Sequence, residues 1–173
     1  NDGSLRPRNT SAELISVPLR GLNVTAALRL FQEVMKTCAP FASFSHRCGI
    51  HVHVNCRQFT VEQVNNIIYT YMCVESLLFD QFVKHNRSGN SFCPALTDCF
   101  VSGISKIKYS ALNRVPLMGL GTLEFRHLQG TDNIEFIEKW ILYLTRLVIY
   151  ATSRPYPKLQ AEILDLNSLS TYD

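Results

Sequence analysis

The stretch Cys48–Asn55, with the sequence CGIHVHVN, constrains the fold more than any other part of the chain. Its isoleucine and valines alternate with His51 and His53, and a period of two is typical of a β-strand with one buried and one polar face. We therefore expect the two imidazoles to project side by side from the polar face. Such a pair can bind a metal or a phosphate-bearing ligand, or it can form ordinary hydrogen bonds at a sheet surface.

Residues 121–127, with the sequence GTLEFRH, show the same alternation. Glu124 and Arg126 lie on the opposite side from the leucine and phenylalanine between them. If both strands belong to one sheet over the same core, His51, His53, Glu124 and Arg126 share the polar face. The planar guanidinium matches carboxylate and phosphate, and beside a metal it is unfavourable unless an anion lies between them. The face therefore suits a metal-bound phosphate and an anionic substrate better than bare zinc, the alternative being an ordinary surface Glu–Arg pair.

The remaining elements follow from periodicity, capping and turn residues. The sequence predicts a strand over Glu13–Leu19 and helices from Thr25 to about Thr37, from the Thr60–Gln63 capping box to about His85, and from Asp132 or Asn133 to about Thr152. Strands with one polar face argue against a parallel sheet covered on both sides. We expect the α+β class, with an antiparallel or mixed sheet, helices on one face and the other face open.

Composition narrows the function classes further. A length of 173 residues suits one domain, and a net charge of +3 from scattered basic residues does not predict nucleic-acid binding. Lys139 and Arg146 interrupt the longest apolar run, so we expect no membrane contact. The six cysteines form no Cys-x-x-Cys pair, which indicates free thiols in a reducing compartment such as the cytoplasm.

Six short motifs occur in order along the chain: Asp2–Leu5, Glu13–Leu19, Gly49–Val54, Arg87–Cys93, Lys108–Asn113 and Gly121–Arg126. With these motifs, over roughly residues 1–150, the chain resembles the putative amidoligase family of phages, bacteria and fungi. That family belongs to the glutamine-synthetase-like carboxylate–amine ligases.

The resemblance implies a curved antiparallel sheet with helices packed outside it, in a glutamine-synthetase-like catalytic core. Residues 1–155 would form this domain, and residues 156–173 a polar C-terminal tail over the surface. The resemblance also implies the activity of an ATP-dependent carbon–nitrogen ligase, with ATP and Mg²⁺ as cofactors. Such an enzyme phosphorylates a carboxylate, and an amine then attacks the acyl phosphate. The substrates would be small-molecule or peptide carboxylates and amines. The protein would lie in the cytoplasm or, if it is encoded by a phage, in the host cytoplasm or the virion.

The resemblance further implies roles for individual residues. His51 and Glu124, with Glu13 as a further ligand, would bind the metal that bridges the ATP phosphates. His53 would lie nearer the nucleotide. Arg126 would hold the substrate carboxylate or the acyl phosphate.

Arg87 matches a loop arginine of the family and would contact phosphate, both in nucleotide binding and in catalysis.

One departure from the family pattern concerns the start of the chain, because the family begins with a Gly-x-Glu-x-Glu strand and nothing of that type precedes Asp2. We therefore expect this N-terminal strand to be missing from the chain. A complementary N-terminal segment or a protein partner would supply it.

Two alternatives belong to other classes. The first is a non-catalytic structural or binding module derived from this fold, for instance in a virus particle, which the absence of the acidic strand favours. The second is a zinc hydrolase that uses His51, His53 and Glu124, against which Arg126 counts.

Overall fold

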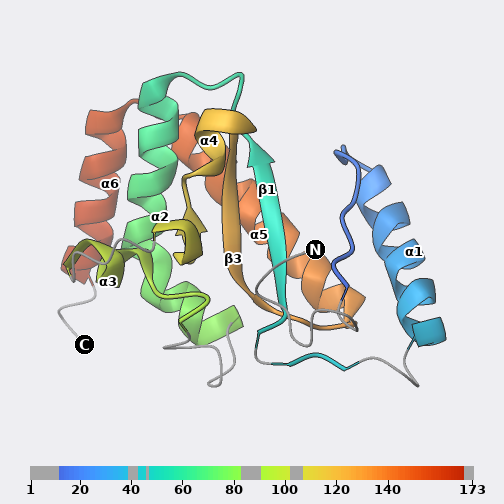
Figure 1. Cartoon of the computed structure of the whole chain (residues 1–173). Helices are drawn as coiled ribbons and strands as arrows, with labels where there is room; N and C mark the ends of the chain where they lie inside the picture. The colour runs from blue at the N-terminus through green and yellow to red at the C-terminus, as the bar shows by residue number, and fades with distance from the viewer. Residues whose placement is uncertain (1–11, 39–42, 46, 83–90, 102–106, 170–173) are drawn as a thin grey trace.

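The computed structural model of the chain describes residues 12–38, 43–45, 47–82, 91–101 and 107–169 (Figure 1). Three of its segments, β1 (Gly49–Asn55), β2 (Leu112–Asn113) and β3 (Thr122–Gln129), form one antiparallel sheet in the order β1-β3-β2. The predicted α+β class and the antiparallel alternative are confirmed. The two strands predicted from alternation, β1 and β3, are direct neighbours.

The described helices are α1 (Asn23–Cys38), α2 (Val61–Phe82), α3 (Leu96–Val101), the short 3₁₀ helix η1 (Ile107–Tyr109), α4 (Pro116–Gly119), α5 (Ile134–Thr152) and α6 (Tyr156–Leu169). Two of the predicted helix starts are confirmed by their caps. Thr60 and Gln63 exchange side chain–backbone hydrogen bonds of 3.0 and 3.2 Å, and Asn133 accepts one of 3.0 Å from the backbone N–H of Phe136. The caps satisfy N–H groups that the first helical turn leaves without partners.

The core lies between the sheet and the two long helices. Figure 1 shows α5 running behind β1 and β3, with α2 and α6 beside it. Leu123 and Phe125 of β3 are fully buried together with Ile67 and Tyr71 of α2 and Trp140 of α5. Each large apolar side chain buried in this way stabilises the fold by about 1.5–3 kcal/mol. The opposite face of the sheet is left to polar side chains.

A β-bulge separates the two halves of the β1–β3 ladder. Ile50 pairs with Leu128, but Val52 pairs with Phe125, so one extra residue of β3 lies opposite His51. A bulge of this kind bends the strand and changes which side chains face the core. As a result His127 and Leu128 are both fully buried, although they are consecutive.

His127 belongs to a buried polar network that joins three elements. The Tyr71 hydroxyl donates to Glu75 Oε1 at 2.5 Å and lies 2.7 Å from His127 Nε2, which must therefore donate to it. Glu75 also accepts the backbone N–H groups of Leu96 and Thr97, at 2.6 and 3.0 Å, and the Thr97 hydroxyl at 2.8 Å. Burial raises the pKa of the Tyr71 hydroxyl well above its usual value. Because buried polar groups need partners, this network holds α2, α3 and β3 in one arrangement.

The predicted strand at Glu13–Leu19 is wrong. These residues take part in no strand pairing, and their apolar side chains are largely exposed, by 61% for Leu14, 83% for Ile15 and 75% for Val17. A strand needs both a ladder partner and a face to bury, and this segment has neither among the described residues. Pro18 also lacks the N–H that a ladder would use.

Residues 156–169 of the predicted C-terminal tail (156–173) form the helix α6, and residues 170–173 lie outside the described residues. Pro155 and Pro157 do follow the end of α5, but they also stand at the start of α6, where the missing N–H of proline costs no hydrogen bond. Leu159 of α6 is fully buried, and Glu162 accepts from Tyr150 at 2.7 Å and pairs with Arg154 at 2.7 Å. The residues 156–169 are therefore a helix packed on the domain.

We expect the Glu75→Gln substitution to destabilise the protein by about 2–3 kcal/mol, because one carboxylate oxygen that accepts two hydrogen bonds becomes an amide donor facing other donors. The measurement is the free energy of unfolding in urea. Asp80→Asn, on the exposed side of the same helix, is the matched control and should change it by less than about 0.5 kcal/mol. Equal effects of the two substitutions would contradict the role given to the network.

Candidate functional site

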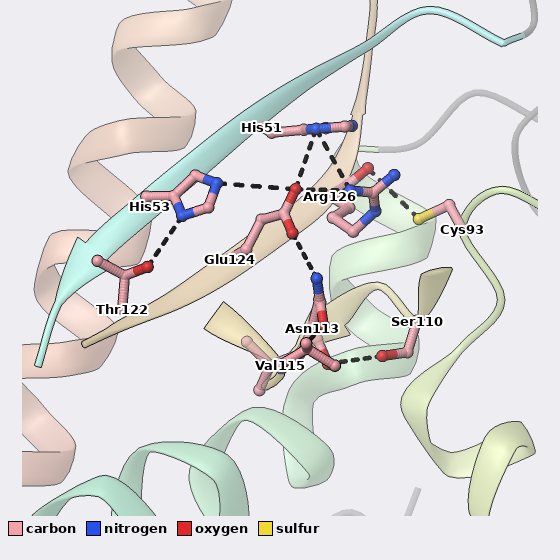
Figure 2. Close-up of polar contacts among 10 residues, drawn as sticks. His51, His53, Cys93, Ser110, Asn113, Val115, Thr122, Glu124 and Arg126 are labelled. Atoms are coloured by element: carbon pink, nitrogen blue, oxygen red, sulfur yellow. Dashed lines mark hydrogen bonds and ion pairs between the residues drawn. The ribbon is translucent and has the colours of Figure 1, made fainter. Parts of the chain in front are cut away.

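The open face of the sheet carries a cluster centred on Glu124 of β3 (Figure 2). Its side chain is only 7% exposed although it lies on the polar side of the strand. The Oε1 atom lies 2.5 Å from the Arg126 guanidinium, 3.0 Å from His51 Nδ1 and 3.8 Å from His53 Nε2. His53 stands directly across the ladder from Glu124, and its Nδ1 lies 3.0 Å from the Thr122 hydroxyl. The predicted shared face of the two strands is confirmed.

Asn113 of β2 completes the cluster, and it was not among the predicted site residues. Its amide nitrogen donates to Glu124 Oε2 at 2.6 Å, while its amide oxygen accepts the backbone N–H of Val115 at 3.0 Å. These two contacts settle the orientation of the amide. One sequence feature could have identified Asn113 as a site residue, namely its position at the end of the Lys108–Asn113 motif. In the structure it follows the buried Leu112 directly.

The position of the His51 proton follows from its neighbours. His51 Nδ1 lies 3.0 Å from the Glu124 carboxylate and 3.4 Å from the Arg126 guanidinium. A guanidinium only donates hydrogen bonds, so a hydrogen bond from Arg126 would require an unprotonated Nδ1. The lone pair of that Nδ1 would then face the negative oxygen of Glu124, which is unfavourable. We therefore assign the proton to Nδ1, which donates to Glu124. In the neutral ring this leaves the Nε2 lone pair of His51 available to a ligand.

The charge of Glu124 is maintained by its donors. Burial by itself raises the pKa of this carboxyl, but the hydrogen bond from His51, the charge of Arg126 and the hydrogen bond from Asn113 outweigh it and bring the pKa to about 2. Glu124 is therefore ionised at neutral pH. A buried carboxylate that stays charged is a site for cations and for polar ligands rather than a proton donor.

The cluster forms one wall of a depression of about 390 Å³. Glu13, Lys108 and Tyr109 contribute polar groups to the lining, and Val115 and Leu120 contribute apolar ones. Glu13, predicted as a further metal ligand, thus lines the same depression as Glu124, although it does so from an irregular segment.

Four of the six predicted site residues line the depression: Glu13, His51, Glu124 and Arg126. A fifth, His53, lies beside it, with Nε2 3.8 Å from Glu124 Oε1. The sixth, Arg87, lies outside the described residues. Within the described part of the chain, no group of three His, Cys, Asp or Glu residues is arranged to hold a metal ion. The roles given to the six residues in metal, nucleotide and substrate binding stay predictions.

The fold and the cluster together define an α+β protein with a charged, open sheet face. A family model described as putative amidoligase enzyme matches residues 5–118, about two thirds of the chain, and the chain belongs to this family. The match includes Glu13, His51, His53 and Asn113, and it ends before Glu124 and Arg126. Neither the curated proteins nor the solved structures gave a match to the chain.

Among the described residues, no helix combines the length and the apolar character that crossing a membrane requires.

The pKa of Glu124 makes a prediction about stability at low pH. Because this pKa is about 2 in the folded protein and 4.5 for an ordinary Glu, the ionised carboxylate contributes stability above pH 4.5. This contribution to the free energy of unfolding is about 3 kcal/mol, and it should be lost as the pH falls from about 4.5 to about 2. Carboxyl NMR titration should locate the transition of Glu124 near pH 2.

The Arg126→Met variant tests the cause of this shift. Removal of the guanidinium takes away one cause of the low pKa and leaves the hydrogen bonds from His51 and Asn113, so the pKa of Glu124 should rise from about 2 and the loss of stability should begin at higher pH. Arg146→Met, on the exposed side of α5, should leave the pKa of Glu124 unchanged. A Glu124 pKa that is the same in both variants would exclude Arg126 as a cause.

Proposed function

We propose that this site joins a carboxylate to an amine in an ATP-dependent reaction that passes through an acyl phosphate. The observation that carries the proposal is the Arg126 guanidinium, held beside a buried, ionised Glu124 and two imidazoles on the open sheet face of an amidoligase-family chain. A planar guanidinium at the wall of a depression is suited to binding a carboxylate or an acyl phosphate.

In the proposed reaction, Arg126 orients the substrate carboxylate while one of its oxygens attacks the γ-phosphorus of ATP. The bond between the γ-phosphorus and the bridging oxygen breaks, and ADP leaves with the electron pair. An amine then attacks the acyl carbon, phosphate departs, and the amine loses a proton to give the amide. The charge of Arg126 stabilises the anionic oxygens in both steps. Arg87, by resemblance, would contact phosphate, and His53 would lie nearer the nucleotide.

The donor chemistry of the depression fits magnesium, which prefers oxygen ligands. Glu13 and Glu124 line the same depression and would supply carboxylate oxygens, with His51 as a lesser ligand. Bound magnesium would neutralise charge on the phosphate oxygens of ATP. Glu124 Oε1 is now paired with Arg126, so a metal has to compete with the guanidinium for that oxygen. Arg126 would then be released toward the substrate anion.

A non-catalytic binding module is the second candidate, and the same pairing favours it. The carboxylate of Glu124 is paired within the protein by Arg126, His51 and Asn113, so its charge has partners that a structural or binding role would also require. A zinc hydrolase is less well supported, because the guanidinium of Arg126 beside Glu124 repels a bare cation.

The purified protein with ATP, Mg²⁺, hydroxylamine and a panel of carboxylates tests the proposal. Hydroxylamine traps an acyl phosphate as a hydroxamate, so ADP, phosphate and hydroxamate should appear in equal amounts and only when a carboxylate is present. Nucleotide binding without any carboxylate-dependent product would favour the binding module.

We expect Arg126→Lys to lower turnover at least about a hundredfold while the affinity for Mg-ATP changes less than about threefold. A lysine ammonium is a point charge and cannot reproduce the paired contacts of a guanidinium with a carboxylate. Arg146→Lys, an exposed change on α5, is the control and should turn over like the parent. Parent-like turnover of Arg126→Lys would reduce Arg126 to a structural partner of Glu124.

We also expect Glu124→Gln to weaken binding of Mg²⁺ in the presence of ATP more than His51→Ala does. Magnesium accepts imidazole poorly and carboxylate oxygen well. Mn²⁺ can replace Mg²⁺ as a paramagnetic probe, and Glu135→Gln on the exposed side of α5 serves as the control. A larger loss for His51→Ala would point to a softer metal than magnesium.

A further inference from the structure

An apolar groove of about 540 Å³ lies next to the depression that contains Glu124 and Arg126. Its lining comes from the beginning of α2 and from α4 with the residues just before it. Phe59, Val64, Ile68 and Leu117 line the groove and also pack against the core, and Asn65 and Arg114 add polar groups to the lining. The groove is therefore anchored on the core through these four apolar side chains.

Val115 forms a common wall of the groove and the depression. Its side chain is 53% exposed, and its backbone N–H is held by Asn113, the residue that also holds Glu124. On the depression side, Pro116 and Leu120 continue the apolar surface away from the charged cluster. One ligand can thus contact the charged wall with a polar end and pass over Val115 into the groove.

We infer that the groove is a subsite for an apolar side chain of the carboxylate substrate. The inference rests on the proposed function, because it takes Arg126 as the group that binds the carboxylate. The substrate class is then a carboxylate that bears a branched or aromatic apolar group, such as an N-acylated apolar amino acid or a peptide ending in one. Burial of that group would select it over a small carboxylate, since a methylene fully removed from water improves affinity about fourfold.

The test measures the affinities of N-acetylglycine, N-acetylalanine and N-acetylleucine by chemical-shift changes in NMR spectra, with and without Mg²⁺ and a non-hydrolysable ATP analogue. We expect N-acetylleucine to bind at least tenfold more tightly than N-acetylglycine. Val64→Thr combined with Val115→Thr keeps the branched shape but places two hydroxyls at the groove. This variant should weaken N-acetylleucine binding at least fivefold and N-acetylglycine binding less than twofold.

Met118→Gln is the matched control, because Met118 is 95% exposed on α4 and lines neither the groove nor the depression. It should leave all three affinities unchanged. If all three ligands bind equally and Arg126→Lys weakens them all, the apolar subsite is wrong while carboxylate binding at Arg126 stands. If none binds, the proposed function fails and the subsite with it.

Discussion

The buried carboxylate of Glu124 is the group on which the site depends. A charge that is almost removed from water is tolerated only when it is paired and hydrogen-bonded. Arg126 comes from the same strand, His51 from β1 and Asn113 from β2, so each strand of the sheet supplies at least one donor. Satisfying one carboxylate thereby sets the relative positions of all three strands on the open face. The same contacts keep the guanidinium at the wall of the depression, where the proposed reaction places the substrate anion.

The two faces of β3 carry two different polar clusters, and adjacent residues at the bulge belong to each of them. On the open side Arg126 belongs to the charged cluster, and on the core side the next residue, His127, belongs to the network of Tyr71 and Glu75. Because that network also caps α3, the backbone of β3 is held firmly behind the site. Catalytic and binding groups are more effective when their supports are rigid, since little reorganisation is then needed on binding.

The competition for Glu124 Oε1 connects the present arrangement to the proposed reaction. In the structure the guanidinium of Arg126 neutralises the carboxylate of Glu124. A divalent cation at Glu124 would take over that neutralisation and leave the guanidinium to an anion. Binding of cation and substrate would then be coupled through one shared ion pair, and each would favour the other.

Alternation along β1 and β3 was enough to predict both strands, their buried faces and the gathering of His51, His53, Glu124 and Arg126, because side-chain direction in a strand follows directly from parity. The same pattern failed at Glu13–Leu19, since parity says nothing about whether a ladder partner exists. The helix α6 was missed because prolines end one helix and begin another equally well. Asn113, the bulge, the apolar groove and the engagement of Glu124 by its donors arise from contacts between segments far apart in the chain. Such contacts are decided by packing and by the need to pair a buried charge, and only the tertiary structure determines them.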